Sequence, residues 1–204
     1  RGLGDVYKRQ VEKVSVDIPF LNFESGGSSS ENVRVSNQEA HAVTLAVRVE
    51  RVIDPGKLSE AYTTTSDVLV LPNQVRIEAG RQDAVQLKLA SGLSQKERVY
   101  RVQFISPDGK SSEKLSLLVF ARPVNPRVKL SWERSGDAIL FRNEGNTNVH
   151  LAHGKLCKSG RAACAGVRDR LIYPGTETKM QVPQGATVEF VQRAGSDFKL
   201  IRVS

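Results

Sequence analysis

The sequence is poor in the residue types that carry out most enzyme chemistry. Its 204 residues include three histidines, two cysteines and one methionine, and only 6% are aromatic. No glycine-flanked serine elbow accompanies the histidines, and no neighbouring acid indicates a catalytic triad. The carboxylates are scattered among basic residues, which is typical of solvated strand faces. We therefore expect no enzymatic activity, no cofactor and no bound metal.

Long apolar runs are also missing from the sequence. No stretch approaches the ~20 apolar residues of a membrane-spanning helix, so we expect no direct insertion into a membrane. The N-terminus carries no recognisable signal peptide, which indicates a mature or trimmed chain. Residues 1–10 contain two glycines and no strand pattern, and we interpret them as a leader foreign to the fold.

The charge of the chain is positive but spread over its whole length. Lysine and arginine total 30 against 22 acidic residues, a formal charge of +8. This balance favours an acidic partner or a carboxylate ligand. Nucleic-acid binding usually combines clustered basic residues with exposed aromatic side chains, whereas the few aromatics here fall mostly at inward positions of the strand pattern. We therefore expect no nucleic-acid partner.

Alternation of apolar and polar residues dominates both halves of the chain. Many short alternating segments separated by glycine, proline, asparagine and serine predict an all-β protein with two immunoglobulin-like sandwiches. Only residues 57–62 predict a helical turn, and residues 107–109 (Pro-Asp-Gly) predict a turn between strands. The alternating segments are residues 14–20, 43–49, 75–77, 85–89, 100–104, 128–130, 138–141, 171–173, 188–191 and 198–201.

Two closely spaced prolines divide the chain. Pro123 and Pro126 form a short, stiff connector with strong strand signals on both sides. We therefore place an N-terminal domain at residues 11–122, a linker at 123–126 and a C-terminal domain at 127–204. A connector this short should hold the two domains at a fixed angle, as an L with a cleft between them.

The only two cysteines, Cys157 and Cys164, have six residues between them. An isolated pair at this spacing favours a local disulfide formed in an oxidising compartment. Two free thiols are the alternative. A zinc site with the nearby His150 and His153 is a weaker alternative, because strand alternation would point those two imidazoles to opposite faces unless the chain bends there.

Within residues 114–122, the segment 115–121 is apolar at nearly every position. A strand with one wet face should alternate, so this pattern indicates a strand that is covered on both faces. It is either a central strand or an edge strand whose outward face, formed by Leu115, Leu117 and Val119, is covered when a partner docks. An unpaired edge of this kind is the template for β-augmentation.

Several short motifs in a fixed order give the chain a resemblance to a known family. It resembles the periplasmic pilus-assembly chaperones of the PapD-like family, and within them the alternate branch that serves colonisation-factor-type fimbriae. The motifs are residues 33–37 (VRVSN), 51–56 (RVIDPG), 68–72 (VLVLP), 97–104 (ERVYRVQF), 143–146 (NEGN), the cysteine pair and 172–174 (IYP).

The resemblance implies a function without ATP or catalysis. Such chaperones lend the last strand of their first domain to a pilus subunit in the periplasm and deliver the subunit to an outer-membrane usher. By position, Leu115, Leu117 and Val119 would be the donor residues, although a bulge would exchange them for Leu118 and Phe120. Self-association through the donor strand would also be compatible with this edge. An Ig-like pilin or an adhesive surface-binding module is the alternative function.

The sequence departs from the family at the site that holds the subunit's terminal carboxylate. The family uses an arginine on the first strand and a lysine on the donor strand, and the corresponding positions here are Phe20 or Leu21 and Leu118. Arg101 is the expected substitute, since it lies on the opposite face of its strand from the core and next to the donor strand. Arg122 is a second candidate.

Arg122 also has a structural role in the resemblance. It matches a family arginine that pairs with a glutamate on the neighbouring strand, here Glu97. This interdomain salt bridge would fix the angle between the two domains.

Overall fold

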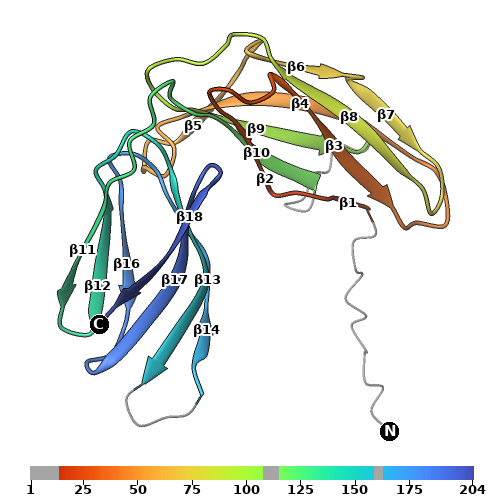
Figure 1. Cartoon of the computed structure of the whole chain (residues 1–204). Helices are drawn as coiled ribbons and strands as arrows, with labels where there is room; N and C mark the ends of the chain where they lie inside the picture. Colours follow the sequence, from red (N-terminus) through yellow and green to blue (C-terminus); the bar gives the residue numbers. More distant parts are fainter. Residues whose placement is uncertain (1–13, 108–114, 159–162) are drawn as a thin grey trace, which may run out of the picture.

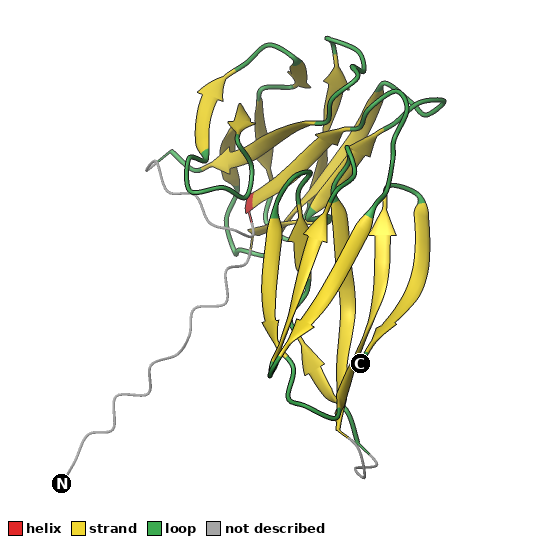
Figure 2. Ribbon diagram, turned by 90° about the vertical axis from the view of Figure 1, so that its left-hand side faces the viewer, coloured by secondary structure: helices red, strands yellow, loops and turns green. Residues whose placement is uncertain are grey.

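The structure is a computed structural model that describes residues 14–107, 115–158 and 163–204. Its regular elements are the strands β1 to β18, arranged as two β-sandwiches. One sandwich lies across the top of Figure 1 and the other hangs from one end of it, so that the two form an L, as the second view also shows (Figures 1 and 2). The prediction of an all-β protein with two sandwiches is confirmed, while the leader at residues 1–10 lies outside the described residues.

The first sandwich consists of a four-stranded sheet and a six-stranded sheet. The four-stranded sheet has the order β1 (Val14–Val16), β3 (Ser30–Asn37), β8 (Gln82–Leu89), β6 (Val68–Leu71). The six-stranded sheet has the order β2 (Phe20–Phe23), β10 (Ser116–Ala121), β9 (Arg98–Ile105), β4 (Val43–Ile53), β5 (Ala61–Thr64), and β7 (Gln74–Ile77) also pairs with β4. The helical turn expected at residues 57–62 is wrong, because turns lead directly into β5 there.

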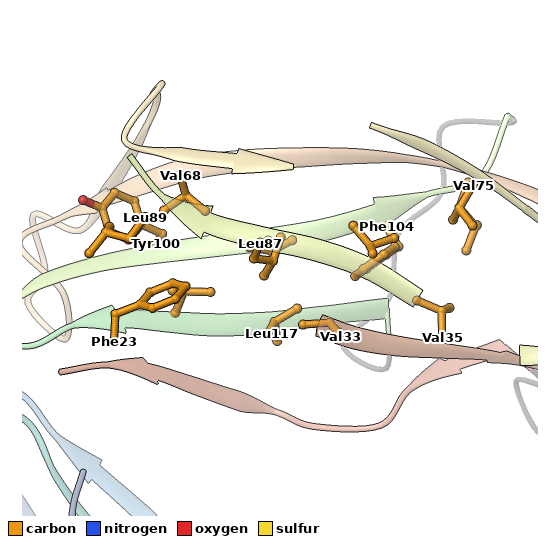
Figure 3. Packing of buried hydrophobic residues seen from close by; sticks show 14 of the residues in the cluster. Phe23, Val33, Val35, Val68, Val75, Leu87, Leu89, Tyr100, Phe104 and Leu117 are labelled. Carbon is orange, nitrogen blue, oxygen red and sulfur yellow. The ribbon is translucent and has the colours of Figure 1, made fainter. Parts of the chain in front are cut away.

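Inward residues of both sheets fill the core of the first sandwich. Val33 and Leu87 from one sheet meet Phe104 and Leu117 from the other (Figure 3), and none of these side chains is more than 2% exposed. The alternation seen in the sequence therefore places one face of each strand in the core and the other outside.

The first alternating segment divides between the two sheets. β1 pairs antiparallel with β3, whereas β2 pairs parallel with β10. The chain changes sheets between them at Asp17, whose carboxylate accepts the backbone N–H of Arg34 (3.2 Å), and at Pro19, which has no N–H to donate. A single strand in the sequence pattern thus becomes one strand in each sheet.

The second sandwich is smaller. Its three-stranded sheet has the order β11 (Leu130–Ser135), β12 (Ala138–Asn143), β16 (Glu177–Gln181). Its five-stranded sheet has the order β14 (Ala165–Val167), β13 (Val149–Lys158), β17 (Ala186–Ala194), β18 (Asp197–Val203), and β15 (Arg170–Ile172) also pairs with β13. Phe141 and Phe190 meet edge to face in its core, with ring centroids 6.1 Å apart.

A short connection joins the sandwiches. β10 ends at Ala121 and β11 begins at Leu130, so the linker proposed at residues 123–126 falls between them. Pro123 forms a parallel bridge with Ser94, and the N–H of Val124 donates to the carbonyl of Ser94 (2.8 Å). These contacts fasten the connection to the first sandwich.

Cys157 and Cys164 form a disulfide that closes the β13–β14 hairpin, with their Cα atoms 4.3 Å apart. The predicted disulfide is confirmed and the alternative of two free thiols is wrong. Within residues 14–107, 115–158 and 163–204, no group of three or more histidine, cysteine or acidic side chains is suited to hold a metal. No helix long and apolar enough to cross a membrane occurs in these same ranges.

Candidate functional site

The candidate site is built around β10, the last strand of the first sandwich. β9 pairs with β10 along Ser116–Ala121, on one side of the strand. On the other side, the register with β2 starts only at Leu118, paired with Phe20, and continues to Ala121, paired with Phe23. Because the two strands run parallel, the first two residues of β10 lie beyond Phe20, the first residue of β2.

The side chains of β10 do not point where the sequence analysis expected. Leu117, which is labelled in Figure 3, and Val119 are 2% and 0% exposed and belong to the core of the first sandwich, and the partly buried Leu115 packs against that core. The expectation that these three side chains form an outward face is therefore wrong. The face turned away from the core carries Leu118 and Phe120, the pair that a bulge was expected to expose, although the strand is regular here.

The second domain explains why this other face is also apolar. Phe120 is buried with Val52 and Val99 in a cluster that includes Tyr173 of the second sandwich, and its ring centroid is 6.4 Å from that of Tyr173. A Cβ atom at Gly56, which has φ +76°, would overlap the Tyr173 ring. One face of β10 thus packs in its own sandwich and the other packs toward the second domain, which accounts for its continuous apolar pattern.

A row of residues crosses the outer face of the six-stranded sheet. Phe20, Leu118, Arg101 and Glu50 are successive partners on β2, β10, β9 and β4. Arg101 therefore lies beside β10 on the side away from the core, where the sequence analysis expected it. Its guanidinium donates to the Glu50 carboxylate (2.6 Å from Nη2) and stacks 3.5 Å from the ring centroid of Tyr62.

Arg122 lies at the junction of the two sandwiches and is 2% exposed. Its Nε donates to the hydroxyl of Thr147 (3.1 Å), and its Nη1 lies 3.4 Å from the Glu24 carboxylate. Thr147 in turn donates to Glu97 (2.7 Å). The sequence predicted a direct salt bridge between Arg122 and Glu97. In the structure the hydroxyl of Thr147, from the second sandwich, lies between them and is hydrogen-bonded to both.

Glu97 binds the second sandwich at a second point. Its carboxylate accepts the backbone N–H and the side-chain amide of Asn148, each at 2.9 Å from Oε2. Burial raises the pKa of the Glu97 carboxyl, while the hydrogen bonds from Thr147 and Asn148 and the charge of Arg122 oppose that rise. Glu97 is therefore a buried acceptor that ties the start of β9 to the second domain.

A cavity of about 490 Å³ opens between the sandwiches. Phe20 and Phe120 of the first sandwich line one side, and His150, Leu171 and Arg193 of the second sandwich line the other. The rings of Phe20 and His150 meet in an edge-on contact with centroids 5.1 Å apart. The cavity therefore combines aromatic walls with polar groups, and it adjoins β10.

The two histidines considered for zinc both line this cavity, together with Asp169. Strict alternation would have pointed His150 and His153 to opposite faces, and that expectation is wrong because β13 has a bulge there, with His153 at φ +54°. One oxygen of Asp169 lies 3.2 Å from His150 Nε2, and the other accepts the N–H of His153 (3.0 Å).

The family of the chain is decided by comparison with known protein families. Residues 21–149, more than half of the chain, match the family described as pili and flagellar-assembly chaperone, PapD N-terminal domain. The chain belongs to this chaperone family. No curated protein sequence matches it.

Solved structures of fimbrial chaperones share the fold of this chaperone over nearly its whole length. The class 5 fimbriae chaperone CfaA is 20% identical with a TM-score of 0.59, covering 94% of this chain and 99% of that chain. The CupB2 chaperone of Pseudomonas aeruginosa is 16% identical with a TM-score of 0.64, covering 92% and 98%. A chain of the Salmonella enterica complex of SafA pilin with the SafB chaperone is 17% identical with a TM-score of 0.61, covering 93% and 95%.

The family and the fold agree with the resemblance derived from the motifs. The family is one of assembly chaperones rather than of enzymes. Sequence reasoning missed Thr147, Asn148 and Arg193 in this chaperone. Only the position of Thr147 and Asn148 directly after the NEGN motif hinted at the first two, and the strand register that brings Arg193 beside His150 has no local signal.

Proposed function

We propose that this chaperone acts in the periplasm, captures pilus subunits by lending them β10 and delivers them to an outer-membrane usher without ATP. The observation that carries the proposal is the match to the pilus-assembly chaperone family, in which the matched residues include all of β10, the last strand of the first sandwich. An added strand would bind β10 through main-chain hydrogen bonds. Stability of the finished subunit fold can then drive release.

Of the three predicted donor residues, Leu115 is proposed to contact the subunit. It is only partly buried and lies at the end of the first core where β2 no longer accompanies β10. Leu117 and Val119 already fill their own core, so their proposed role is to hold the donor strand in place. Full burial of an apolar side chain such as Leu115 by a subunit would contribute about 1.5–3 kcal/mol.

The two candidate carboxylate anchors are proposed to have different roles. Arg122 is 2% exposed and holds the domain junction. Arg101 is 28% exposed and lies beside Leu118, so it is the proposed anchor for a subunit carboxylate on this face. Such a carboxylate would compete with Glu50 for the guanidinium.

The proposed compartment and the alternative function rest on separate features. The Cys157–Cys164 disulfide supports an oxidising compartment such as the periplasm. An Ig-like pilin or adhesive module is not favoured, because the chain belongs to the chaperone family.

Co-expression with candidate pilus subunits of the source organism tests the proposal. Each subunit is directed to the periplasm with and without this chain, and we expect at least one subunit to become soluble and to co-purify with it. Leu115→Glu should abolish this complex while the variant stays folded, although the contact of Leu115 with the core makes a lower melting temperature expected. Leu58→Glu, at a fully exposed loop position, is the matched control. Capture of a subunit by a folded Leu115→Glu variant would refute the donor-strand assignment.

A further inference from the structure

Two large apolar side chains stand exposed on the last strand of the chain. Phe198 and Leu200 on β18 are 79% and 71% exposed. They alternate with Ile201 and Val203, which lie in the core of the second sandwich, so they point to the outer face of the sheet. β18 is also an edge strand of that sheet. Exposed apolar side chains grouped on an edge strand are typical of an interaction surface.

Strand pairing connects Phe198 to residues that line the interdomain cavity. Phe198 is paired with Arg193 on β17, and Arg193 is paired with His150 on β13. Arg193 and His150 both line the cavity. Two positions further along, on the same face, Leu200 is paired with Val191. We call Phe198, Leu200, Val191 and Arg193 the cleft-wall patch.

The first sandwich reaches the same cavity through β10 and its neighbour. Phe120 on β10 and Phe20 on β2 line the cavity opposite the second sandwich. The β17–β18 turn, at Gly195, also lines it and lies close to β2 in Figure 1. Arg193 of the cleft-wall patch therefore lines the same cavity as Phe120 of the strand proposed to hold the subunit.

Arg193 gives the patch a positive charge. Within the part of the chain that the structure describes, no carboxylate lies within ion-pair distance of its guanidinium, which contacts His153 Nε2 at 3.2 Å. The cavity carboxylate, Asp169, is engaged by His150 and by the N–H of His153. Arg193 is thus placed to meet an acidic group brought by a partner.

We propose that the cleft-wall patch is a second contact surface for the same subunit that β10 captures, covering an apolar strand face that carries an acidic group opposite Arg193. The inference rests on the proposed function and adds a role in client binding for the second sandwich. A subunit held at β10 faces the patch across the cleft, so the second contact forms at a high effective concentration. Its expected effect is to slow release of the subunit.

The test uses the subunit that the wild-type chaperone keeps soluble. Labelled subunit is loaded on each variant, and its transfer to excess unlabelled wild-type chaperone measures the release rate. We expect Phe198→Ser with Leu200→Ser to speed release at least about tenfold, since two large apolar contacts are lost. Arg193→Gln should speed release about three- to tenfold and make it less sensitive to salt.

Matched controls are available for both changes. Leu58→Ser removes a fully exposed leucine away from the patch, and Arg76→Gln removes an exposed arginine on β7 of the first sandwich. Neither control should change the release rate by more than about twofold. Both patch variants should keep wild-type melting temperatures, because their side chains are at the surface.

The outcomes separate this inference from the proposed function. If the wild type captures no subunit, the proposed function fails. If capture succeeds and the double variant releases the subunit at the wild-type rate, the patch inference alone is overturned. A wild-type dimer that the double variant converts to a monomer, with release unchanged, would identify the patch as a contact between two copies and would likewise overturn it.

Discussion

The guanidinium of Arg122 occupies the place where a Cβ atom on Gly195 would lie. Gly195 forms the β17–β18 turn with φ +63°, a backbone region that glycine adopts at little cost. Arg122 follows β10 directly, so this close approach joins the end of one sandwich to a turn of the other. Glu24 also lies close to the same position.

Gly195→Ala should therefore disturb the domain junction. The left-handed backbone alone costs a non-glycine residue about 1–3 kcal/mol, and the added Cβ atom would also displace Arg122. Gly185→Ala is the matched control, because Gly185 has φ +73° but no neighbouring atom within 4 Å of the point where a Cβ atom would be added. Equal losses of unfolding free energy in the two variants, measured by urea denaturation, would contradict a role for the Arg122 contact.

Leu117→Ala should destabilise the first sandwich by about 2–5 kcal/mol, the usual cost of truncating a buried leucine. The physical reason is its place in the core, where it is 2% exposed. Leu69→Ala, at a leucine that is 44% exposed, should change stability by less than about 1 kcal/mol. Thermal unfolding measures both, and a small effect at Leu117 would show that this side chain is not a core residue.

The stability of the chaperone should fall as the pH drops below about 6.5, in part because of His150. Burial lowers the pKa of His150 below the ordinary value of 6.5, the charges of Arg193 and His153 lower it further, and Asp169 opposes the shift. The unfolded chain then binds a proton at a higher pH than the folded chain does. The contribution of His150 is thus complete above pH 6.5 and is lost as the pH falls toward the folded pKa.

His150→Gln should flatten this pH dependence, since glutamine does not titrate. His41→Gln, at an exposed histidine of the first sandwich, is the control and should retain the wild-type slope. Unfolding free energies measured between pH 5 and 8 give the comparison. A wild-type slope in the His150→Gln variant would assign the pH dependence to other groups.

Reduction of the Cys157–Cys164 disulfide should lower stability by about 2–2.5 kcal/mol, because the bond closes a short loop in the unfolded chain. The double replacement with alanine should give a similar loss. Denaturation with and without a reducing agent measures the effect, which should vanish in the alanine variant. Since the bond closes only the β13–β14 hairpin, subunit capture by β10 should persist after reduction.

Local pattern in the sequence was sufficient for the fold class. Alternation and turn residues located most strands, and the spacing of the cysteines indicated their bond. The sequence could not predict which side chains of β10 point into the core, because a strand that is apolar at nearly every position is compatible with both orientations. Leu117 and Val119 lie in the core of their own sandwich, and Leu118 packs in the cluster that includes Leu171 and Tyr173 of the second domain, so the orientation of β10 depends on contacts that are distant in the sequence.

The site residues that sequence reasoning missed depend on long-range register. A bulge in β13 lets the side chains of His150 and His153 line the same cavity. The alternating sequence of the strand gives no local sign of this bulge. Thr147 contacts residues 25 and 50 positions away in the chain. By contrast, the sequence aligned Phe20 or Leu21, and Leu118, to the family's two basic positions, and the structure pairs Leu118 with Phe20.

Arg122 is the covalent neighbour of the last residue of β10, and its side chain is fastened to the second sandwich through Thr147. A subunit bound at the beginning of β10 would therefore bind a strand whose other end is anchored to the second sandwich. A pulling force on the strand would be transmitted through Arg122 to the domain junction and would not readily separate β10 from its sheet. The domain junction would thus resist the force that a bound subunit exerts on β10.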